Sequence, residues 1–150
     1  MNISYLGNKS LLDLPKTAFL ASSTIPVDKV LPCYDWVVKM RDGNRCVVSG
    51  FSSKLEKDVL NFLLKGKQPI ILVLARQMYK HVPQDLQPLL DDGRLLIIST
   101  TSATRQSKTT SLARNRYICE IANRILFVAA YQQSSLATLE QTYKHKSIKL

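Results

Sequence analysis

The sequence predicts an α/β fold in which a mostly parallel sheet lies between two layers of helices. Five short apolar runs, rich in Val, Ile and Leu, recur along the chain. They do not alternate polar with apolar residues, which is typical of strands covered on both faces. Their first residues lie 24 to 30 positions apart, which leaves room for one helix in each connection. The expected strands are 17–21, 46–48, 70–74, 95–98 and 125–130.

Helices are expected between and after these strands, at 28–41, 54–65, 84–92, 112–123 and 135–143. Each strand, its helix and the next strand form a βαβ unit, and repeated units build a doubly wound, Rossmann-like sheet with helices on both faces. Ligands of such sheets bind beyond the carboxyl ends of the strands. Those ends are the loops 22–26, 49–53, 75–83, 99–110 and 131–135.

Composition narrows the class of protein. The chain has 150 residues, 45% of them hydrophobic, and we expect a single domain spanning residues 1–150. The formal net charge of +10 is unevenly spread, because residues 1–92 hold twelve Lys and Arg against nine Asp and Glu, whereas residues 93–150 hold nine against two. Such a basic excess favours a polyanionic partner, either nucleic acid or a nucleotide.

Several classes of protein are disfavoured. Cys33, Cys46 and Cys119 are odd in number, far apart and set among apolar residues, which indicates free buried thiols in a reducing compartment. Cysteine and histidine do not cluster at the spacing of a metal site. No apolar run reaches the roughly 18 residues needed to cross a bilayer. We therefore expect a soluble cytoplasmic protein without a signal peptide, metal, cofactor or membrane association.

Arg114, Asn115 and Arg116 stand at the expected start of a helix that is followed by an apolar strand. The free N–H groups and the positive end of a helix dipole favour an anion there, and arginine adds bidentate donors. The triplet is therefore interpreted as a phosphate clamp, preceded by Lys108 on a Ser/Thr-rich loop. The alternative is a solvated first helical turn, because surface arginines commonly contribute little.

The loop 49–53 reads Ser-Gly-Phe-Ser-Ser and joins an expected strand to a helix that begins at Lys54. Its glycine and hydroxyls would let a phosphate approach the backbone. A cation in the first helical turn opposes the dipole unless an anion is bound there. The simpler interpretation is a capping box, in which Ser53 and Glu56 each bond to a backbone N–H group.

Enzymatic chemistry has little support. The sequence contains neither a three-glycine dinucleotide fingerprint nor a Walker lysine loop. Nothing in the sequence brings His81 or His145 beside a loop serine as a general base. We therefore expect a binding protein and no enzyme.

Aromatic side chains near the strand ends are candidates for stacking on bases, because single strands are held by basic grooves with aromatic faces. Tyr79 and Tyr131 follow strand ends and are the better candidates, whereas Phe51 and Tyr117 fit the core more readily. Trp36 lies in the first expected helix and is interpreted as a core or subunit-interface residue.

These motifs occur in an order that resembles the DNA-processing protein A family, also called Smf or DprA. The likeness extends along nearly the whole chain, and its most specific element is the Arg-Asn-Arg triplet before an Ile-containing helix and an apolar strand. The similar segments are 5–12, 16–22, 47–51, 114–116 and 134–138.

The resemblance implies a single-stranded DNA binder, commonly dimeric, that helps to hand incoming DNA to a recombinase. It does not imply catalysis. Taken together with the loop positions, it leads us to expect phosphate contacts from Ser22, Ser23, Ser49, Gly50, Lys54, Lys108, Arg114, Asn115, Arg116, Ser134 and Ser135.

The chain departs from the family pattern in several places. Ser23 stands where a basic residue is usual, residues 54–56 replace a Gly-Ile-Asp triplet, Leu60 replaces a histidine, and Ala129 replaces a carboxylate. The chain is therefore interpreted as a divergent member. Two alternatives stay open, namely a small-nucleotide-binding or sensing domain without catalysis, and a structural or partner-binding relative.

Overall fold

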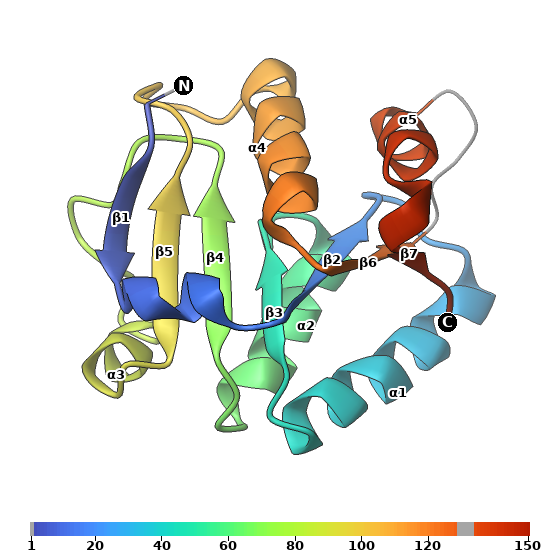
Figure 1. Ribbon diagram of the computed structural model, residues 1–150, viewed down its shortest axis with the longest axis horizontal. Coiled ribbons are helices and arrows are strands. Elements are labelled where there is room, and N and C mark those ends of the chain that lie inside the picture. Colours follow the sequence, from blue (N-terminus) through green and yellow to red (C-terminus); the bar gives the residue numbers. More distant parts are fainter. Residues whose placement is uncertain (1, 129–133) are drawn as a thin grey trace.

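The computed structural model describes residues 2–128 and 134–150, which form an α/β structure around a seven-stranded sheet (Figure 1). The strand order is β1-β5-β4-β3-β2-β6-β7. All five expected strands are present and pair in parallel, although residues 129 and 130 of the last one lie outside the described residues. They are β2 (Lys16–Ala21), β3 (Cys46–Ser49), β4 (Ile70–Leu74), β5 (Leu95–Ser99) and β6 (Arg124–Val128).

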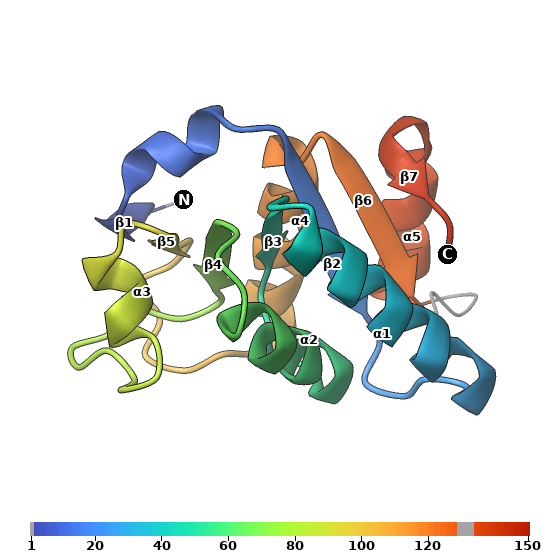
Figure 2. The ribbon, with the colours of Figure 1, turned by 90° about the horizontal axis from the view of Figure 1, so that it is seen from below.

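Helices cover both faces of the sheet, which confirms the doubly wound prediction (Figure 2). On one face lie α1 (Val27–Asp42), α2 (Lys54–Leu64) and α3 (Gln87–Asp91), and on the other lie α4 (Lys108–Ile121) and α5 (Ser135–Thr142). The chain adds β3, β4 and β5 on one side of β2 and then crosses to place β6 on its other side. This reversal between β2 and β6 is the topological switch point, where ligands of such folds bind.

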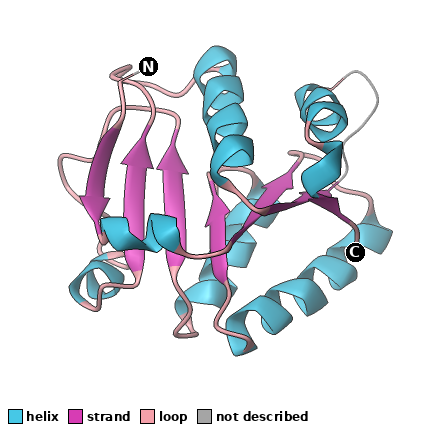
Figure 3. Ribbon diagram, in the orientation of Figure 1, coloured by secondary structure: helices cyan, strands magenta, loops and turns pink. Residues whose placement is uncertain are grey.

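Two short strands at the edges of the sheet, drawn in magenta with the other strands in Figure 3, were not expected. β1 (Ser4–Gly7) pairs antiparallel with β5, and β7 (Ser147–Ile148) pairs with β6. They are accompanied by the 3₁₀ helices η1 (Lys9–Asp13) and η2 (Lys144–Lys146). Every residue of β1 is exposed, so no buried apolar run marks it in the sequence.

Side chains of the central strands pack alternately into two hydrophobic cores, one on each face of the sheet. Both faces of these strands are therefore buried, which explains why their sequences are continuous apolar runs. In β4, Ile70 and Leu72 pack toward α1 and α2, whereas Ile71 and Val73 pack toward α4 and α5. Trp36 is half-buried, and its ring stacks on that of Phe19 with centroids 5.2 Å apart. Its placement against the core agrees with the sequence-based interpretation.

The three cysteines are free and buried, as expected. Burial raises the pKa of Cys33 to about 11 and the pKa values of Cys46 and Cys119 to about 12. The thiols therefore stay protonated near neutral pH, where thiolate chemistry would require a lowered pKa.

Two expected helices begin three or four residues away from their predicted starts. The helix expected at 112–123 starts at Lys108, because the side chains of Ser107 and Thr110 cap each other's backbone N–H groups. The helix expected at 84–92 is shortened to Gln87–Asp91. Pro88 lacks the N–H group that would bond to the carbonyl of residue 84, so the α-helical ladder does not extend further back.

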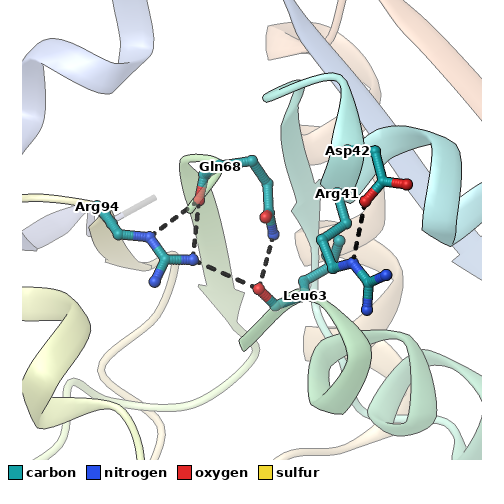
Figure 4. Close-up of polar contacts among 5 residues, drawn as sticks. All are labelled: Arg41, Asp42, Leu63, Gln68 and Arg94. Carbon is teal, nitrogen blue, oxygen red and sulfur yellow. Dashed lines mark hydrogen bonds and ion pairs between the residues drawn. The ribbon is translucent and has the colours of Figure 1, made fainter. Parts of the chain in front are cut away.

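At the amino ends of β4 and β5, hydrogen bonds join the residues that precede these strands to the end of α2 (Figure 4). Arg94 donates to the carbonyl of Gln68 at 3.3 Å and to that of Leu63 at 3.4 Å, and the Gln68 amide donates to the same Leu63 carbonyl at 2.9 Å. Arg41 and Asp42 form a 3.4 Å ion pair nearby, but sequence neighbours on the surface gain little from such a pair.

Candidate nucleic-acid interface

A hollow of about 760 Å³, here named the large hollow, opens at the carboxyl edge of the sheet. Its walls come from the loop after β2, from the start of α4 and from the start of α5, so it lies at the topological switch point. Four of the expected site residues line it together, namely Ser23, Lys108, Asn115 and Ser135. The large hollow thus collects residues that are up to 112 positions apart in the sequence.

Two helix N-termini meet the large hollow. The Ser107 hydroxyl accepts the N–H of Thr110 at 3.2 Å, and the Ser134 hydroxyl accepts the N–H of Ala137 at 3.1 Å. Each cap satisfies one N–H group of its helix, whereas the first turn of an α-helix presents several without an intrahelical partner. The remaining N–H groups and the positive dipole ends favour a negatively charged ligand.

Arg114 lies elsewhere than the sequence predicted. Because α4 begins at Lys108, Arg114 falls in its second turn and not at its N-terminus, and it faces inward with only 3% of its surface exposed. Its Nε donates to the Asn115 side chain at 2.7 Å, and its Nη1 and Nη2 donate to the Val73 carbonyl at 3.3 Å and to the Ser52 hydroxyl at 3.1 Å. The exposed clamp at a helix start is therefore corrected to a buried tie between α4 and the ends of β3 and β4.

Gly50 lies against this guanidinium, and both Gly50 and its neighbour Ser49 are buried. The Ser49 hydroxyl accepts the N–H of Phe51 at 3.1 Å, within a turn that holds Phe51 at the left-handed φ of 48°. A Cβ atom on Gly50 would come within 2.1 Å of Arg114 Nη1, so only glycine lets the arginine pass. Phe51 itself is buried, which confirms its assignment to the core.

The expected capping box at the start of α2 is confirmed, and the Glu56 carboxylate also accepts a hydrogen bond from outside this box. One carboxylate oxygen accepts the N–H groups of Ser52 and Ser53, while the other accepts the N–H of Ala21 at the end of β2. Burial lowers the pKa of Arg114, and the nearby Glu56 carboxylate acts in the opposite direction. Glu56 thus joins the end of β2 to the loop after β3, and Arg114 joins that loop to β4 and α4.

The remaining expected site residues are spread around this edge. Asn115 is half-buried and held by Arg114, whereas Arg116 is exposed one position further along α4. Lys54 is exposed beside a separate hollow of about 230 Å³, which is given no name here. The backbone N–H of Ser22 donates to the Val128 carbonyl. Ala129 and Tyr131, both named from the sequence, lie outside the described residues.

A second hollow of about 380 Å³, here named the small hollow, is lined by Arg114 and shares Gln106 with the large hollow. Tyr79, expected to stack on bases, is half-buried in its wall, and the Arg76 guanidinium lies 5.7 Å from the centre of its ring. Burial also raises the pKa of the Tyr79 hydroxyl. Sequence reasoning did not single out Arg76 or Asp85, because neither belongs to a local motif.

Two further findings concern metal binding and the crossing of a membrane. Within residues 2–128 and 134–150, no three His, Cys, Asp or Glu side chains are grouped so as to hold a metal ion. No helix in the described part of the chain is both long and apolar enough to cross a membrane.

Comparison with known proteins agrees with these observations. DNA processing protein A from Streptococcus pneumoniae superimposes with a TM-score of 0.77 at 18% sequence identity, over 98% of this chain and 54% of that one. For DNA processing protein A from Helicobacter pylori, described for its single-stranded DNA binding mode, the TM-score is 0.75 at 19% identity, over 98% of this chain and 70% of that one. The chain thus spans about half the length of the first protein.

These likenesses establish the Rossmann-like fold that the sequence predicted. None of the curated protein sequences compared with the chain matches it. The family model for DNA recombination-mediator protein A matches residues 1–148, nearly the full length of the chain. The chain therefore belongs to the DNA recombination-mediator protein A family.

Proposed function

We propose that this chain is a single-stranded DNA-binding module of the DNA-processing type, and that the sugar-phosphate backbone crosses the large hollow. The observation that carries the proposal is the composition of that hollow at the N-termini of α4 and α5. Hydroxyl and amide groups surround Lys108, and none of the described residues lining the large hollow is acidic. Phosphates are bound in proteins by this combination of donors.

The proposal gives the expected site residues two kinds of role. Ser23, Lys108, Asn115 and Ser135 contact phosphate directly, because they line the large hollow. The exposed Lys54 and Arg116 attract the strand from either side. The remaining expected residues are positioning residues, which hold the loops and helix ends in place: Ser22, Ser49, Gly50, Arg114 and Ser134.

Binding through phosphates makes the affinity independent of sequence and sensitive to salt. Each neutralised phosphate releases counterions, so affinity falls steeply as the salt concentration rises. The net charge of +10 adds long-range attraction for the strand. The chain would act by binding, without catalysis and without a cofactor.

The family supports a wider role, which we include in the proposal. The module would work in the cytoplasm, as a single binding domain over residues 1–150, and hand DNA to a recombinase. Self-association into a homodimer and capture of a purified recombinase are tested by analytical ultracentrifugation and by pull-down with bound oligonucleotide.

The proposal is tested by fluorescence anisotropy with a labelled thymidine oligonucleotide at about 50 and 200 mM salt. The variant Lys108→Ala/Asn115→Ala removes one charge and one amide from the large hollow. The matched control is Lys39→Ala, which removes an exposed lysine in the last turn of α1, away from the carboxyl edge. We expect saturable binding that weakens with salt, a loss of about tenfold or more in the double variant, and a smaller change in the control.

Equal affinities for the double variant and for Lys39→Ala would contradict a backbone path through the large hollow. Failure of the wild-type protein to bind at low salt would contradict DNA binding altogether. In that case the small-nucleotide alternative takes precedence.

A further inference from the structure

Another hollow, here named the amino-edge hollow, lies at the edge of the sheet opposite to the large hollow. Its walls are formed by residues 14–17 at the start of β2, residues 44–46 at the start of β3 and residues 123–124 at the start of β6, and these strands are neighbours in the sheet. The six residues of β2 separate it from the carboxyl edge by roughly 20 Å. Its volume of about 340 Å³ falls within the range of small-molecule sites, which is about 300 to 1,000 Å³.

The lining of the amino-edge hollow is basic. It includes Lys16, Arg45 and Arg124, and none of the described residues that form it is acidic. The lining therefore carries a charge of about +3 near neutral pH, because lysine and arginine are protonated there. The large hollow has one cation among its described lining residues, Lys108. The amino-edge hollow is thus the more positive of the two.

The two arginines of the amino-edge hollow have donors available for a ligand. Both are exposed, and within residues 2–128 and 134–150 neither guanidinium takes part in a hydrogen bond or an ion pair. The strand register places them on either side of β2. Arg124 lies opposite Thr17, and the residue that follows Arg45 lies opposite Lys16. A group held over the start of β2 therefore lies between the two arginines.

Other polar groups at the start of β2 are already held in place. The Asn123 Oδ1 accepts the N–H of Lys16 at 2.8 Å, which leaves the two N–H groups of the Asn123 side chain for a ligand. The Lys16 ammonium donates to the carbonyls of Leu12 and Leu14 at 2.7 and 2.9 Å, and only 8% of this residue is exposed. In the described part of the chain this ammonium has no carboxylate partner, which favours an anion nearby.

Cations continue along the same edge beyond the hollow. Each of the five parallel strands begins at a cation or within three residues of one. In sheet order, from β5 to β6, this cationic row consists of Arg94, Lys67, Arg45, Lys16 and Arg124. Five strands that are about 4.8 Å apart span about 19 Å.

The two ends of the cationic row differ in how their donors are used. Figure 4 shows the end at Arg94, which donates to backbone carbonyls, while Arg41 beside it pairs with Asp42. The charge of Asp92 also acts on Arg94. Donors without a partner and without an acidic neighbour are therefore concentrated at the other end, in the amino-edge hollow.

We propose that the amino-edge hollow binds a phosphate group, which Arg45 and Arg124 contact through bidentate hydrogen bonds and Asn123 contacts through its amide. Arginine forks and amide groups are donors that proteins use for phosphate oxygens. A free phosphorylated molecule and a nucleic-acid backbone present the same group, and the length of the cationic row favours the backbone. The inference goes beyond the proposed function, because it requires no ligand in the large hollow.

Nuclear magnetic resonance of the isotope-labelled full-length chain tests this site directly. Inorganic phosphate is titrated at constant ionic strength, with sodium chloride as the reference. We expect saturable shifts of the backbone amide signals of residues 16, 17, 45, 123 and 124. Arg45→Ala/Arg124→Ala should weaken phosphate binding at this edge by about tenfold or more, because hydrogen bonds from two charged donors are lost.

The matched control is Lys29→Ala/Lys39→Ala, which removes two exposed charges of α1 that line neither the amino-edge hollow nor the large hollow. It should change the affinity by less than about twofold, because isolated surface charges contribute little. Circular dichroism checks that the variants fold, and the single variant Arg124→Ala replaces the double variant if the latter does not.

Fluorescence anisotropy with the labelled thymidine oligonucleotide identifies the source of the phosphate. The protein carries Lys108→Ala/Asn115→Ala, so that the large hollow contributes little. If adding Arg45→Ala/Arg124→Ala lowers the affinity, and lowers the slope of log affinity against log salt by about 0.7 for each lost phosphate contact, the phosphate belongs to a nucleic acid. If only the binding of inorganic phosphate is lost, the ligand is a free phosphorylated molecule. Either result supports the inference.

The inference is overturned if the amide signals of the amino edge respond to phosphate no more than to chloride, or if Arg45→Ala/Arg124→Ala binds phosphate as tightly as the control does. A polyglutamate peptide that shifts these signals where phosphate does not would also overturn it, and would assign the hollow to an acidic protein segment. Its failure is separable from failure of the DNA-binding proposal. The latter depends on Lys108 and Asn115, which lie outside the amino-edge hollow.

Discussion

Replacing Gly50 by alanine tests whether the Arg114 guanidinium organises the carboxyl edge. The added Cβ would lie 2.1 Å from Nη1, 2.4 Å from Cζ and 2.8 Å from Nε of Arg114, so the guanidinium must move. The backbone at Gly50 is not in the left-handed region, so alanine itself is not strained there. The whole effect therefore comes from displacing Arg114.

The magnitude follows from the bonds that would be disturbed. Arg114 donates to Val73, Ser52 and Asn115, and a hydrogen bond from a charged group contributes about 1.5 to 3 kcal/mol. If the displaced side chain keeps some of these bonds, the free energy of unfolding should fall by about 3 kcal/mol. For a chain of this size, each kcal/mol lowers the midpoint of thermal unfolding by about 2 to 4 °C, so we expect a shift of about 6 to 12 °C.

Urea denaturation of a double-mutant cycle separates the clash from other effects. The four proteins are the wild type, Gly50→Ala, Arg114→Ala and the double variant. In the Arg114→Ala background the clash is absent, so Gly50→Ala should change the free energy of unfolding by less than about 0.5 kcal/mol. A cost below about 1 kcal/mol in the wild type, or equal costs in both backgrounds, would refute the reasoning.

Four further predictions concern the hydrogen bonds that support the site and the buried thiol of Cys46. Glu56→Gln should lower the free energy of unfolding, measured by urea denaturation, by about 1 to 3 kcal/mol, because the glutamine amide cannot accept all three backbone N–H groups. Glu140→Gln is the control. Equal effects of the two substitutions would contradict the role of Glu56. Ser107→Ala should cost about 1 kcal/mol by removing the cap of α4, measured in the same way, whereas an unchanged value would mean that Thr110 caps the helix alone. Cys46 should resist a thiol reagent at pH 8 until the protein unfolds, and fast labelling of the native protein would contradict its burial. Its pKa is raised from 9.0 to about 12 by folding, so its contribution to stability is complete below pH 9 and is lost as the pH rises toward 12, which thermal unfolding across that range measures.

Much of the fold is predictable from local patterns. The five central strands appear as apolar runs because both of their faces are buried, as the fully buried Ile71 and Ile97 illustrate. The start of α2 is predictable because Ser53 and Glu56 are three residues apart and cap the same turn. The β1 edge strand leaves no such pattern in the sequence, since its side chains are exposed and it pairs with β5 residues that are 89 to 95 positions away.

The candidate site was predictable in outline but not in geometry. The sequence pointed to the carboxyl edge and to Arg114 and Asn115, but it placed both at a helix start. A cap made by two hydroxyl residues, Ser107 and Thr110, lacks the glutamate that usually marks a capping box. The start of α4 was therefore expected one turn too late, and the buried position of Arg114 followed from the true start.

By itself, the sequence determined the α/β class, the order of strands and helices along the chain, the capping of α2 and the resemblance to the family. The class and the order of elements depend on which residues of each segment are shielded from water, and the spacing of apolar residues shows this directly. The cap of α2 depends on two residues that are three positions apart. Only the tertiary structure decided that Arg114 covers Gly50, 64 positions away, and that Ser23 meets Lys108 and Ser135 in one hollow. The reason is that β2 lies between β3 and β6, so loops distant in sequence converge at one edge of the sheet through a strand order that no local pattern contains.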